Sequence, residues 1–163
     1  MKKVRKIRER LPALQHVIVV DGNPAKLKDG EIFFDMEQGD RVEDFPVFRA
    51  DPESPSVLHY TSGTTGQPKG AQHVHYSVIS QYITAKWVLD LREDDVYWCN
   101  ADPGWVTGTS YGIMAPLAIG ATLVIDEAEF DATRWYGILE QERVNVWYTA
   151  PTAIRMLMKA GRD

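Results

Sequence analysis

The chain has 163 residues, of which 44% are hydrophobic and 25% charged, and its net charge is −5. This composition is typical of a globular protein with a core of its own, and the acidic balance argues against a nucleic-acid partner. No stretch approaches the about 18 consecutive apolar residues of a membrane span, no apolar run of a signal peptide follows the basic start, and the single cysteine, Cys99, suits a reducing, cytoplasmic location without disulfides.

The first part of the chain predicts short elements separated by polar loops. Residues 3–10 carry the charges of a helix end, and residues 16–20 (HVIVV) form a β-branched run that stops at an Asp-Gly turn, as a strand does. Residues 21–55 are rich in Asp, Glu, Gly and Pro, which predicts a loop with one short strand or helix near residues 32–34. Residues 56–60 (SVLHY) predict a strand that leads into a glycine-rich stretch.

After that stretch, helical and strand patterns alternate. Residues 73–90 show helical spacing of four apolar side chains, Tyr76, Ile79, Ile83 and Trp87. The elements predicted next are a strand at 95–99, a helix at 108–118, a strand at 122–125, a helix at 131–142 capped by Asp131, a strand at 144–149 and a helix opened by Pro151. This alternation predicts an α/β fold, a mostly parallel sheet with flanking helices.

Three side chains with reactive or titratable groups are assigned structural roles. His73 and His75 are placed at the start of the helix predicted at 73–90, as packing or capping residues. Cys99 lies in the apolar run VYWCN and is interpreted as a core residue rather than a nucleophile.

The glycine-rich stretch is residues 60–70, YTSGTTGQPKG. Glycines permit positive φ angles, so that backbone N–H groups can converge on an anion, and the hydroxyl groups and Lys69 add further donors and a positive charge. This composition suits a polyphosphate, although the spacing matches neither a Walker A loop nor a Rossmann fingerprint. An ordinary surface loop, with Lys69 merely solvated, is the alternative.

The same string resembles the phosphate-binding loop of the adenylate-forming superfamily, which includes acyl-CoA synthetases, luciferases and peptide-synthetase adenylation domains. The resemblance implies that the loop holds the β- and γ-phosphates of ATP through Thr61, Ser62, Gly63, Thr64, Thr65, Gly66 and Lys69. The resemblance also implies that the chain folds as part of the large N-terminal domain of that superfamily.

Two further stretches, residues 100–111 (NADPGWVTGTSY) and 147–155 (WYTAPTAIR), resemble short-chain acyl-CoA synthetases, and the acetate–CoA ligases most of all. The resemblance implies that Trp105, Val106 and Thr107 lie at the acyl pocket and the thiol tunnel. It places Ala150 on the pantetheine channel. Simple core packing is the alternative for both groups. The chain departs from many acetate–CoA ligases in reading Gly-Thr-Ser, with Thr109 in the middle, where they read Gly-His-Ser.

The implied reaction joins acetate to coenzyme A with ATP and Mg²⁺, releasing AMP and pyrophosphate. A ligase for propionate or another short- or medium-chain acid is one alternative, and a non-catalytic nucleotide-binding or structural fragment is another. A carrier-protein-dependent adenylation domain is disfavoured, because the motifs TAPTAIR and GWVTG resemble CoA ligases.

Several parts of the superfamily are not found in residues 1–163. These are the Thr-Glu segment that contacts adenine and magnesium, the ribose-binding aspartate, and the C-terminal domain with its adenylation lysine. We therefore expect a fragment of the N-terminal domain that is inactive alone, and we assign no catalytic residue and no metal ligand. A truncated sheet exposes apolar surface, which predicts self-association.

Overall fold

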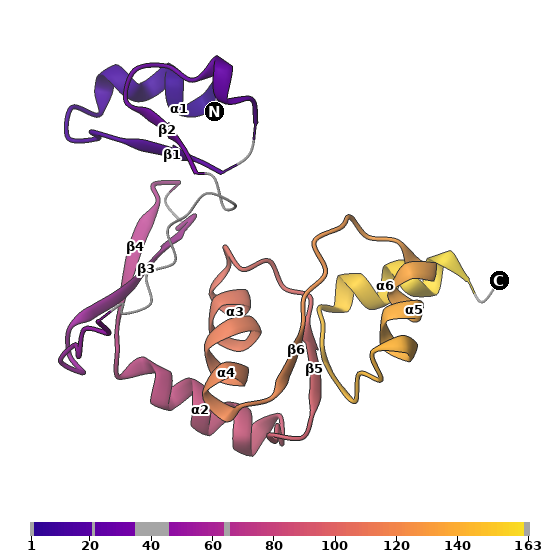
Figure 1. Ribbon diagram of the computed structural model, residues 1–163. Coiled ribbons are helices and arrows are strands. Elements are labelled where there is room, and N and C mark those ends of the chain that lie inside the picture. Colours follow the sequence, from indigo (N-terminus) through magenta and orange to yellow (C-terminus); the bar gives the residue numbers. More distant parts are fainter. Residues whose placement is uncertain (1, 21, 35–45, 64–65, 162–163) are drawn as a thin grey trace. The chain divides into compact units, whose positions relative to one another are not determined.

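The structure is a computed structural model that describes residues 2–20, 22–34, 46–63 and 66–161. The chain forms two compact units, Met1–Phe48 and Arg49–Asp163, and Figure 1 shows the elements of each in chain order. No helix among the described residues is both long and apolar enough to cross a bilayer.

The first unit is a small motif of helix and parallel strands. Its elements are α1 (Lys2–Ile7), a 3-10 turn (Arg8–Arg10), β1 (Val17–Val19), a second 3-10 turn (Pro24–Lys26) and β2 (Glu31–Phe33). β1 and β2 pair in parallel, with Ile18 opposite Ile32. The strand predicted at 16–20 and the helix predicted at 3–10 are therefore confirmed, and the element predicted near 32–34 is a strand. Part of the loop predicted at 21–55, namely residues 21 and 35–45, lies outside the described residues.

An ion pair joins α1 to β2 in this unit. Arg5 donates from Nε to Oε1 of Glu31 at 2.7 Å and from Nη2 to Oε2 at 2.6 Å. The Lys28 N–H donates to Oε2 at 2.9 Å, and the Glu31 side chain is only 2% exposed. The hydrogen bond from Arg5 lowers the pKa of Glu31 to about 2. The folded unit therefore favours the ionised carboxylate.

Acid is expected to weaken this unit between pH 4.5, the ordinary pKa of Glu31, and about pH 2, its folded value. Because the folded pKa is the lower one, the ion pair stabilises fully above this window, and its contribution is lost as pH falls through it. The measurement is the pH dependence of the Glu31 carboxyl and of the β1 and β2 amides by NMR. Arg5→Gln should raise the pKa of Glu31, and a midpoint near 4.5 in the unaltered chain would contradict the assignment.

The second unit begins with an antiparallel hairpin of β3 (Pro55–Thr61) and β4 (Lys69–Val74), in which Thr61 lies opposite Lys69. The strand predicted at 56–60 is confirmed. The antiparallel pair is an exception to the otherwise parallel pairing of the chain, and the alternation of strands and helices did not reveal it.

The helix predicted at 73–90 has the wrong start, because α2 spans Ser77–Val88. His73 pairs with Val57 in the hairpin, and the ladder holds the backbone extended as far as Val74. His73 packs edge-on against His59 at 5.5 Å between ring centroids, and His75 lies in the following turn, where its N–H donates to the Ser54 carbonyl. Placing the two histidines at a helix start was therefore incorrect.

A three-stranded parallel sheet forms the centre of the second unit. β5 (Val96–Cys99) lies between β6 (Thr122–Val124) and β7 (Val146–Tyr148). The helical segments are α3 (Val106–Thr109), a π-helical stretch (Ser110–Met114), α4 (Ala115–Ile119), α5 (Ala132–Gln141) and α6 (Pro151–Ala160). Every strand and helix predicted after residue 90 is found within a few residues, and the mostly parallel α/β fold is confirmed.

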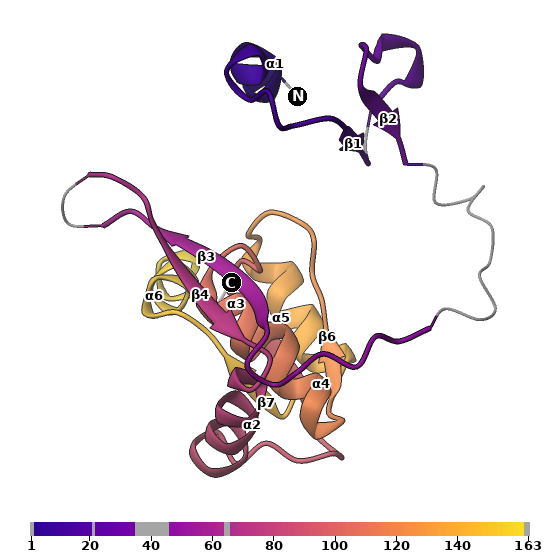
Figure 2. The ribbon, with the colours of Figure 1, turned by 90° about the vertical axis from the view of Figure 1, so that its left-hand side faces the viewer.

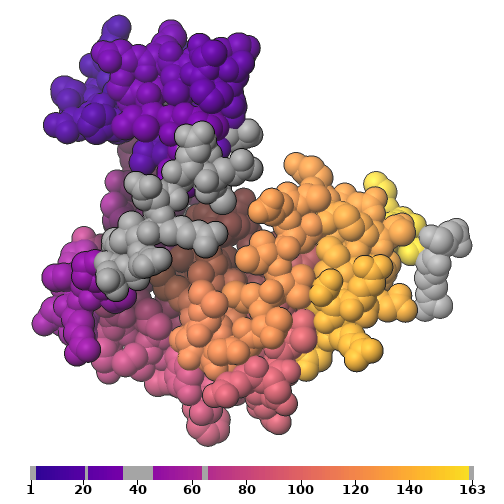
Figure 3. Space-filling view, in the orientation of Figure 1, coloured from indigo at the N-terminus to yellow at the C-terminus, as the bar shows by residue number. Residues whose placement is uncertain are grey.

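Helices cover both faces of this sheet. Successive side chains of β5 point to opposite faces, and each face packs against helices. Tyr97 packs in a cluster with Ala85 of α2 and Ala115 of α4, and Trp98 packs with Trp135 of α5 and Leu157 of α6. Figure 2 gives a second view of this arrangement, and Figure 3 shows the α5 and α6 segments packed against each other. The result is a three-layer arrangement in which the middle strand is buried on both faces.

Local signals explain where the later helices begin. The Asp131 carboxylate accepts a hydrogen bond from the Arg134 N–H at 2.7 Å, which confirms it as the cap of α5. Pro151 occupies the first turn of α6, where its missing N–H costs nothing. Ala150 therefore stands at the boundary between β7 and α6.

Candidate functional site

The glycine-rich stretch forms the turn of the β3–β4 hairpin. β3 ends at Thr61, β4 begins at Lys69, and these two residues face each other across the ladder. Thr61, Ser62, Gly66 and Lys69 are exposed, whereas Gly63 is half-buried. Thr64 and Thr65, two of the residues predicted to hold phosphate, lie outside the described residues. The described donors of the turn are therefore presented mostly to solvent, at the end of a pair of hydrogen-bonded strands.

Two glycines of the turn have backbone conformations that other residues adopt only with strain. The φ angles are 57° at Gly63 and 76° at Gly66. A Cβ at Gly63 would lie 2.8 Å from the Gln67 carbonyl oxygen, so that space as well as φ requires glycine there. These conformations are the kind that turn successive N–H groups towards one concave side.

Lys69 lies across this turn. Its Cε and Cδ atoms are 3.6 and 3.7 Å from the position of a Cβ at Gly63, so the aliphatic stem follows the loop backbone. Within the described ranges, no carboxylate forms an ion pair with Lys69. Among the described residues, its ammonium group therefore has no carboxylate to neutralise it.

The second group of predicted site residues lies at the carboxyl edge of the three-stranded sheet. After β5, a short turn leads to Trp105, whose extended backbone (φ −96°, ψ 152°) precedes α3. Trp105 is 74% exposed and Val106 49% exposed, and Thr107 is half-buried. Ligands of open α/β sheets bind outside the carboxyl ends of the strands, which is where these three residues lie.

Ala150 lies at the same edge, directly after β7. The Asn100 N–H donates to the Tyr148 carbonyl at 3.3 Å, which holds the ends of β5 and β7 side by side. Ala150 is exposed and makes no side-chain cap for α6. The structure thus brings Ala150 and the turn before Trp105 to one edge.

The turn itself is held by residues that sequence reasoning missed. The Asp102 carboxylate accepts from the Gly104 N–H at 2.6 Å, and the Asp102 carbonyl accepts from the Trp105 N–H at 2.9 Å. The Thr109 hydroxyl donates to the Pro103 carbonyl at 2.7 Å. The Asp-Pro-Gly string was a turn signal that could have identified Asp102. Nothing local in the sequence indicated the contact from Thr109.

A cavity of about 630 Å³ lies beside this turn, at the ends of β5 and β6. Its lining includes Cys99, whose thiol pKa is raised by burial, and four carboxylate residues: Asp102, Asp126, Glu127 and Glu129. The bond from Arg134 lowers the pKa of Asp126, which favours its charged form. Such a lining repels a carboxylate substrate, and Trp105, Val106 and Thr107 are not among its residues. None of the three residues that the resemblance assigns to the acyl pocket therefore lines this cavity.

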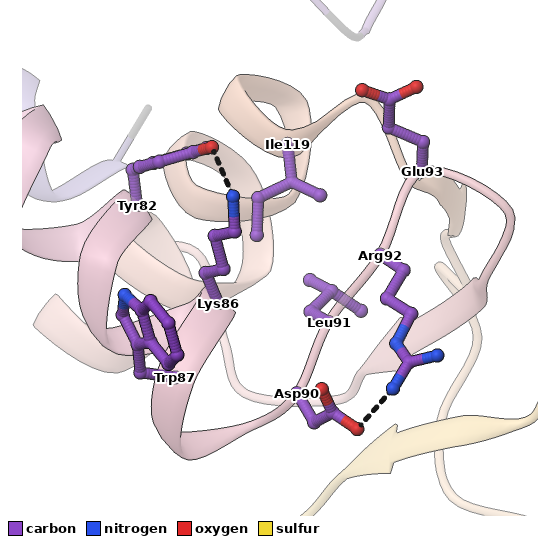
Figure 4. A pocket seen from close by; sticks show the side chains of 8 residues that line it. All are labelled: Tyr82, Lys86, Trp87, Asp90, Leu91, Arg92, Glu93 and Ile119. Atoms are coloured by element: carbon purple, nitrogen blue, oxygen red, sulfur yellow. Dashed lines mark hydrogen bonds and ion pairs between the residues drawn. The ribbon is translucent and has the colours of Figure 1, made fainter.

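A smaller cavity of about 370 Å³ lies at the end of α2, before β5 begins (Figure 4). Its two cationic side chains already have partners, because Arg92 pairs with Asp90 at 2.9 Å and the Lys86 ammonium contacts the Tyr82 hydroxyl at 3.3 Å. It lies at the amino edge of the sheet, away from Trp105 and Ala150. Neither its charge nor its place favours a role in the site.

The two groups of predicted site residues remain separate in the described structure. No hydrogen bond, ion pair or ring contact among the described residues joins the hairpin turn to Trp105 or Ala150. No cluster of three or more His, Cys, Asp or Glu side chains that could hold a metal ion occurs in the part of the chain that the structure describes. The described residues therefore form a glycine turn and a sheet edge, each built by local contacts.

Comparison with known proteins covers the whole chain. The family model described as "AMP-binding enzyme" matches residues 1–163. The acetyl-coenzyme A synthetase of Bacillus subtilis is 54% identical over 155 residues, which are 95% of this chain and 27% of that protein. The acetyl-coenzyme A synthetase of Methanothrix thermoacetophila is 45% identical over 164 residues, which are 94% of this chain and 24% of that protein. The chain thus spans about a quarter of the length of these curated relatives.

Two solved structures of CoA-ligase enzymes superpose on this chain and share its fold. An acyl-CoA synthetase of Brucella canis superposes with a TM-score of 0.81 at 28% identity, covering 98% of this chain and 29% of that one. An anthranilate CoA ligase in complex with anthranoyl-AMP superposes with a TM-score of 0.77 at 27% identity, covering 92% and 29%. The similarity extends over both units of the chain.

Proposed function

Because the chain belongs to the AMP-binding enzyme family, we propose that it forms part of an AMP-forming ligase that joins acetate to coenzyme A. The observation that carries this proposal is the glycine turn between β3 and β4. There the aliphatic stem of Lys69 lies against Gly63, one of two glycines with positive φ, and no described carboxylate forms an ion pair with its ammonium group. The relatives named acetyl-coenzyme A synthetase, similar over 94–95% of the chain, support acetate as the acid.

The reaction has two steps. In the first, an oxygen of acetate attacks the α-phosphorus of ATP, the bond to the bridging oxygen breaks, and pyrophosphate leaves with that electron pair, giving acetyl-adenylate. In the second, the coenzyme A sulfur attacks the acetyl carbonyl, AMP leaves, and the thiol proton is released. Mg²⁺ bound with ATP would neutralise phosphate charge, and no residue of this chain is proposed to ligate it.

The chain contributes positioning and charge to the first step. The turn residues Thr61, Ser62, Gly63, Gly66 and Lys69 are proposed to hold the β- and γ-phosphates. Thr64 and Thr65 are proposed for the same role on the family resemblance alone. Donors placed in advance stabilise the charge that builds up on the leaving pyrophosphate, since they need no reorganisation during the reaction.

The sheet edge is proposed to hold the acid and the thiol. Trp105, Val106 and Thr107 would line the acyl pocket, where bulky and branched side chains limit the length of the acid. Ala150 would line the channel for the pantetheine arm, because its small side chain leaves room beside the strand ends. The exposure of Trp105 and Ala150 supports access from solvent.

Residues 1–163 are proposed to belong to the large N-terminal domain of this ligase, and the ligase is proposed to be cytoplasmic. The superposition on acyl-CoA and anthranilate CoA ligases supports the first statement. The single cysteine supports the second.

The test is acetate-dependent exchange of pyrophosphate into ATP by the complete protein that contains these residues. We expect exchange with acetate, weaker exchange with propionate, and none from the 163-residue chain alone. Preference for propionate would overturn the assignment of acetate. Nucleotide binding without any exchange by the complete protein would overturn the ligase proposal.

The isolated 163-residue chain is expected to self-associate. The outer face of α2 exposes Ile79 at 45%, Ile83 at 47% and Trp87 at 77%, and their spacing places them on one stripe. Contiguous apolar surface of this kind drives association in water. Light scattering at several concentrations measures it. Replacing Ile83 and Trp87 with glutamine should lower the apparent mass, and a monomer at all concentrations would contradict the expectation.

A further inference from the structure

The Thr109 side chain connects the turn between β5 and α3 to the following helix. The Thr109 hydroxyl lies 2.7 Å from the Pro103 carbonyl oxygen and 3.2 Å from the Trp105 carbonyl oxygen. A hydroxyl has one proton, so the shorter contact is its main hydrogen bond. The contact to Trp105 is the usual one between a helical threonine and the residue four positions earlier. The bond to Pro103 reaches back beyond the helix into the turn.

The Pro103 carbonyl depends on this hydroxyl. Among the described residues, no backbone N–H outside regular elements donates to it, and α3 begins only at Val106. The hydrogen bonds from Gly104 and Trp105 to Asp102 act within the turn, and Gly108 of α3 packs against the Asp102 backbone. Among the described residues, Thr109 is the side chain that hydrogen-bonds the Pro103 part of the turn to the helix.

The Trp105 side chain has little else to define its place. It is 74% exposed, and its ring makes no stacked or edge-on contact with another ring in the described part of the chain. The backbone at the end of the turn therefore sets the direction of its Cα–Cβ bond. A change in the tilt of the turn moves the base of the indole side chain.

From these contacts we infer that Thr109 is a positioning residue that sets the selectivity for the acid, acting through Trp105. This inference rests on the proposed function, in which Trp105 lines the acyl pocket. The hydroxyl does not touch the reacting atoms. It holds the Pro103 carbonyl so that the indole limits the pocket to a two-carbon acid.

The first experiment tests the positioning in the complete protein without measuring any activity. Labelling with 5-fluorotryptophan gives ¹⁹F signals that include those of the five tryptophans of this chain, and Trp105→Phe identifies the Trp105 signal by its loss. Thr109→Val, which keeps the shape and removes the hydroxyl, should shift or broaden the Trp105 signal. Thr109→Ser, which keeps the hydroxyl, should leave the Trp105 signal as it is in the unaltered protein. The signals of the buried Trp98 and Trp135 report whether each variant remains folded.

The second experiment measures selectivity in the complete protein. Thr109→Val should lower the ratio of kcat/KM for acetate to that for propionate by about tenfold, the lower end of what one methylene group is worth, while KM for ATP stays unchanged. Thr109→Ser should keep the ratio. The matched control is Thr133→Val, because Thr133 is exposed on α5 and makes no side-chain hydrogen bond among the described residues.

The two experiments separate the inference from the proposed function. A Trp105 signal that does not change in Thr109→Val, or an unchanged selectivity ratio in an active protein, would overturn the inference. A complete protein that activates neither acid would overturn the proposed function and, with it, the role in selectivity. The ¹⁹F result would then still decide whether Thr109 fixes the turn.

Discussion

Replacing Gly108 with alanine is expected to lower the free energy of unfolding of the second unit by about 3 kcal/mol. A Cβ at this position would lie 2.0 Å from the Asp102 carbonyl oxygen, 2.5 Å from its carbonyl carbon and 2.8 Å from the Ala101 carbonyl oxygen. These atoms belong to the backbone of the turn after β5, so relief requires a shift of either the turn or α3. Gly108 is also buried, which leaves no room towards solvent.

Urea denaturation followed by circular dichroism measures this effect. Gly137→Ala is the matched control, because a Cβ at Gly137 meets only the Gln141 amide nitrogen at 3.9 Å and the position lies inside α5. Alanine is the better helix former, so this control should stabilise by about 0.5–1 kcal/mol. Equal midpoints for the two variants would show that the turn and α3 are not packed as described.

Replacing Lys69 with alanine is expected to reduce acetate-dependent ATP–pyrophosphate exchange by the complete protein about a hundredfold, the lower range for loss of one preorganised donor. The ammonium group beside Gly63 is proposed to face the phosphates, and the charge that builds up there has no substitute cation in the described turn. Stability should change little, because Lys69 is exposed and forms no ion pair with a described residue.

Two further variants make the Lys69 experiment specific. Lys69→Arg keeps the charge with different geometry and should retain part of the exchange. Lys159→Ala removes an exposed lysine in the last turn of α6 and should leave exchange unchanged. Full exchange in Lys69→Ala would mean that the turn does not hold the phosphates through this residue.

Most of the second unit could be predicted, because its signals are local. Asp131 caps α5 with a carboxylate that reaches only three residues along the chain, and Pro151 opens α6 through its own ring. The run around Trp98 alternates between the two faces of the sheet, so the strand is encoded by its own residues.

The hairpin could not be predicted in the same way. Tyr76, Ile79 and Ile83 have helical spacing, and that pattern was extended back over residues that form β4. Pairing of His73 with Val57 and of Lys69 with Thr61 decides the structure there. Such pairing joins residues that are distant in the sequence, and the sequence of a short segment indicates it only weakly. The apolar spacing proved correct only from α2 onwards.

By itself, the sequence determined the family, the alternation of strands and helices, and the residues of the glycine turn. Each of these features is encoded by short contiguous segments of the chain. Gly63 and Gly66 permit positive φ, and the structure shows that both adopt it. Only the tertiary structure decided that Lys69 lies against Gly63, that Gly108 must be glycine, and that Thr109 holds Pro103. These facts depend on where folded backbones pass each other within a few ångströms, and no spacing of residue types along a chain specifies such an approach.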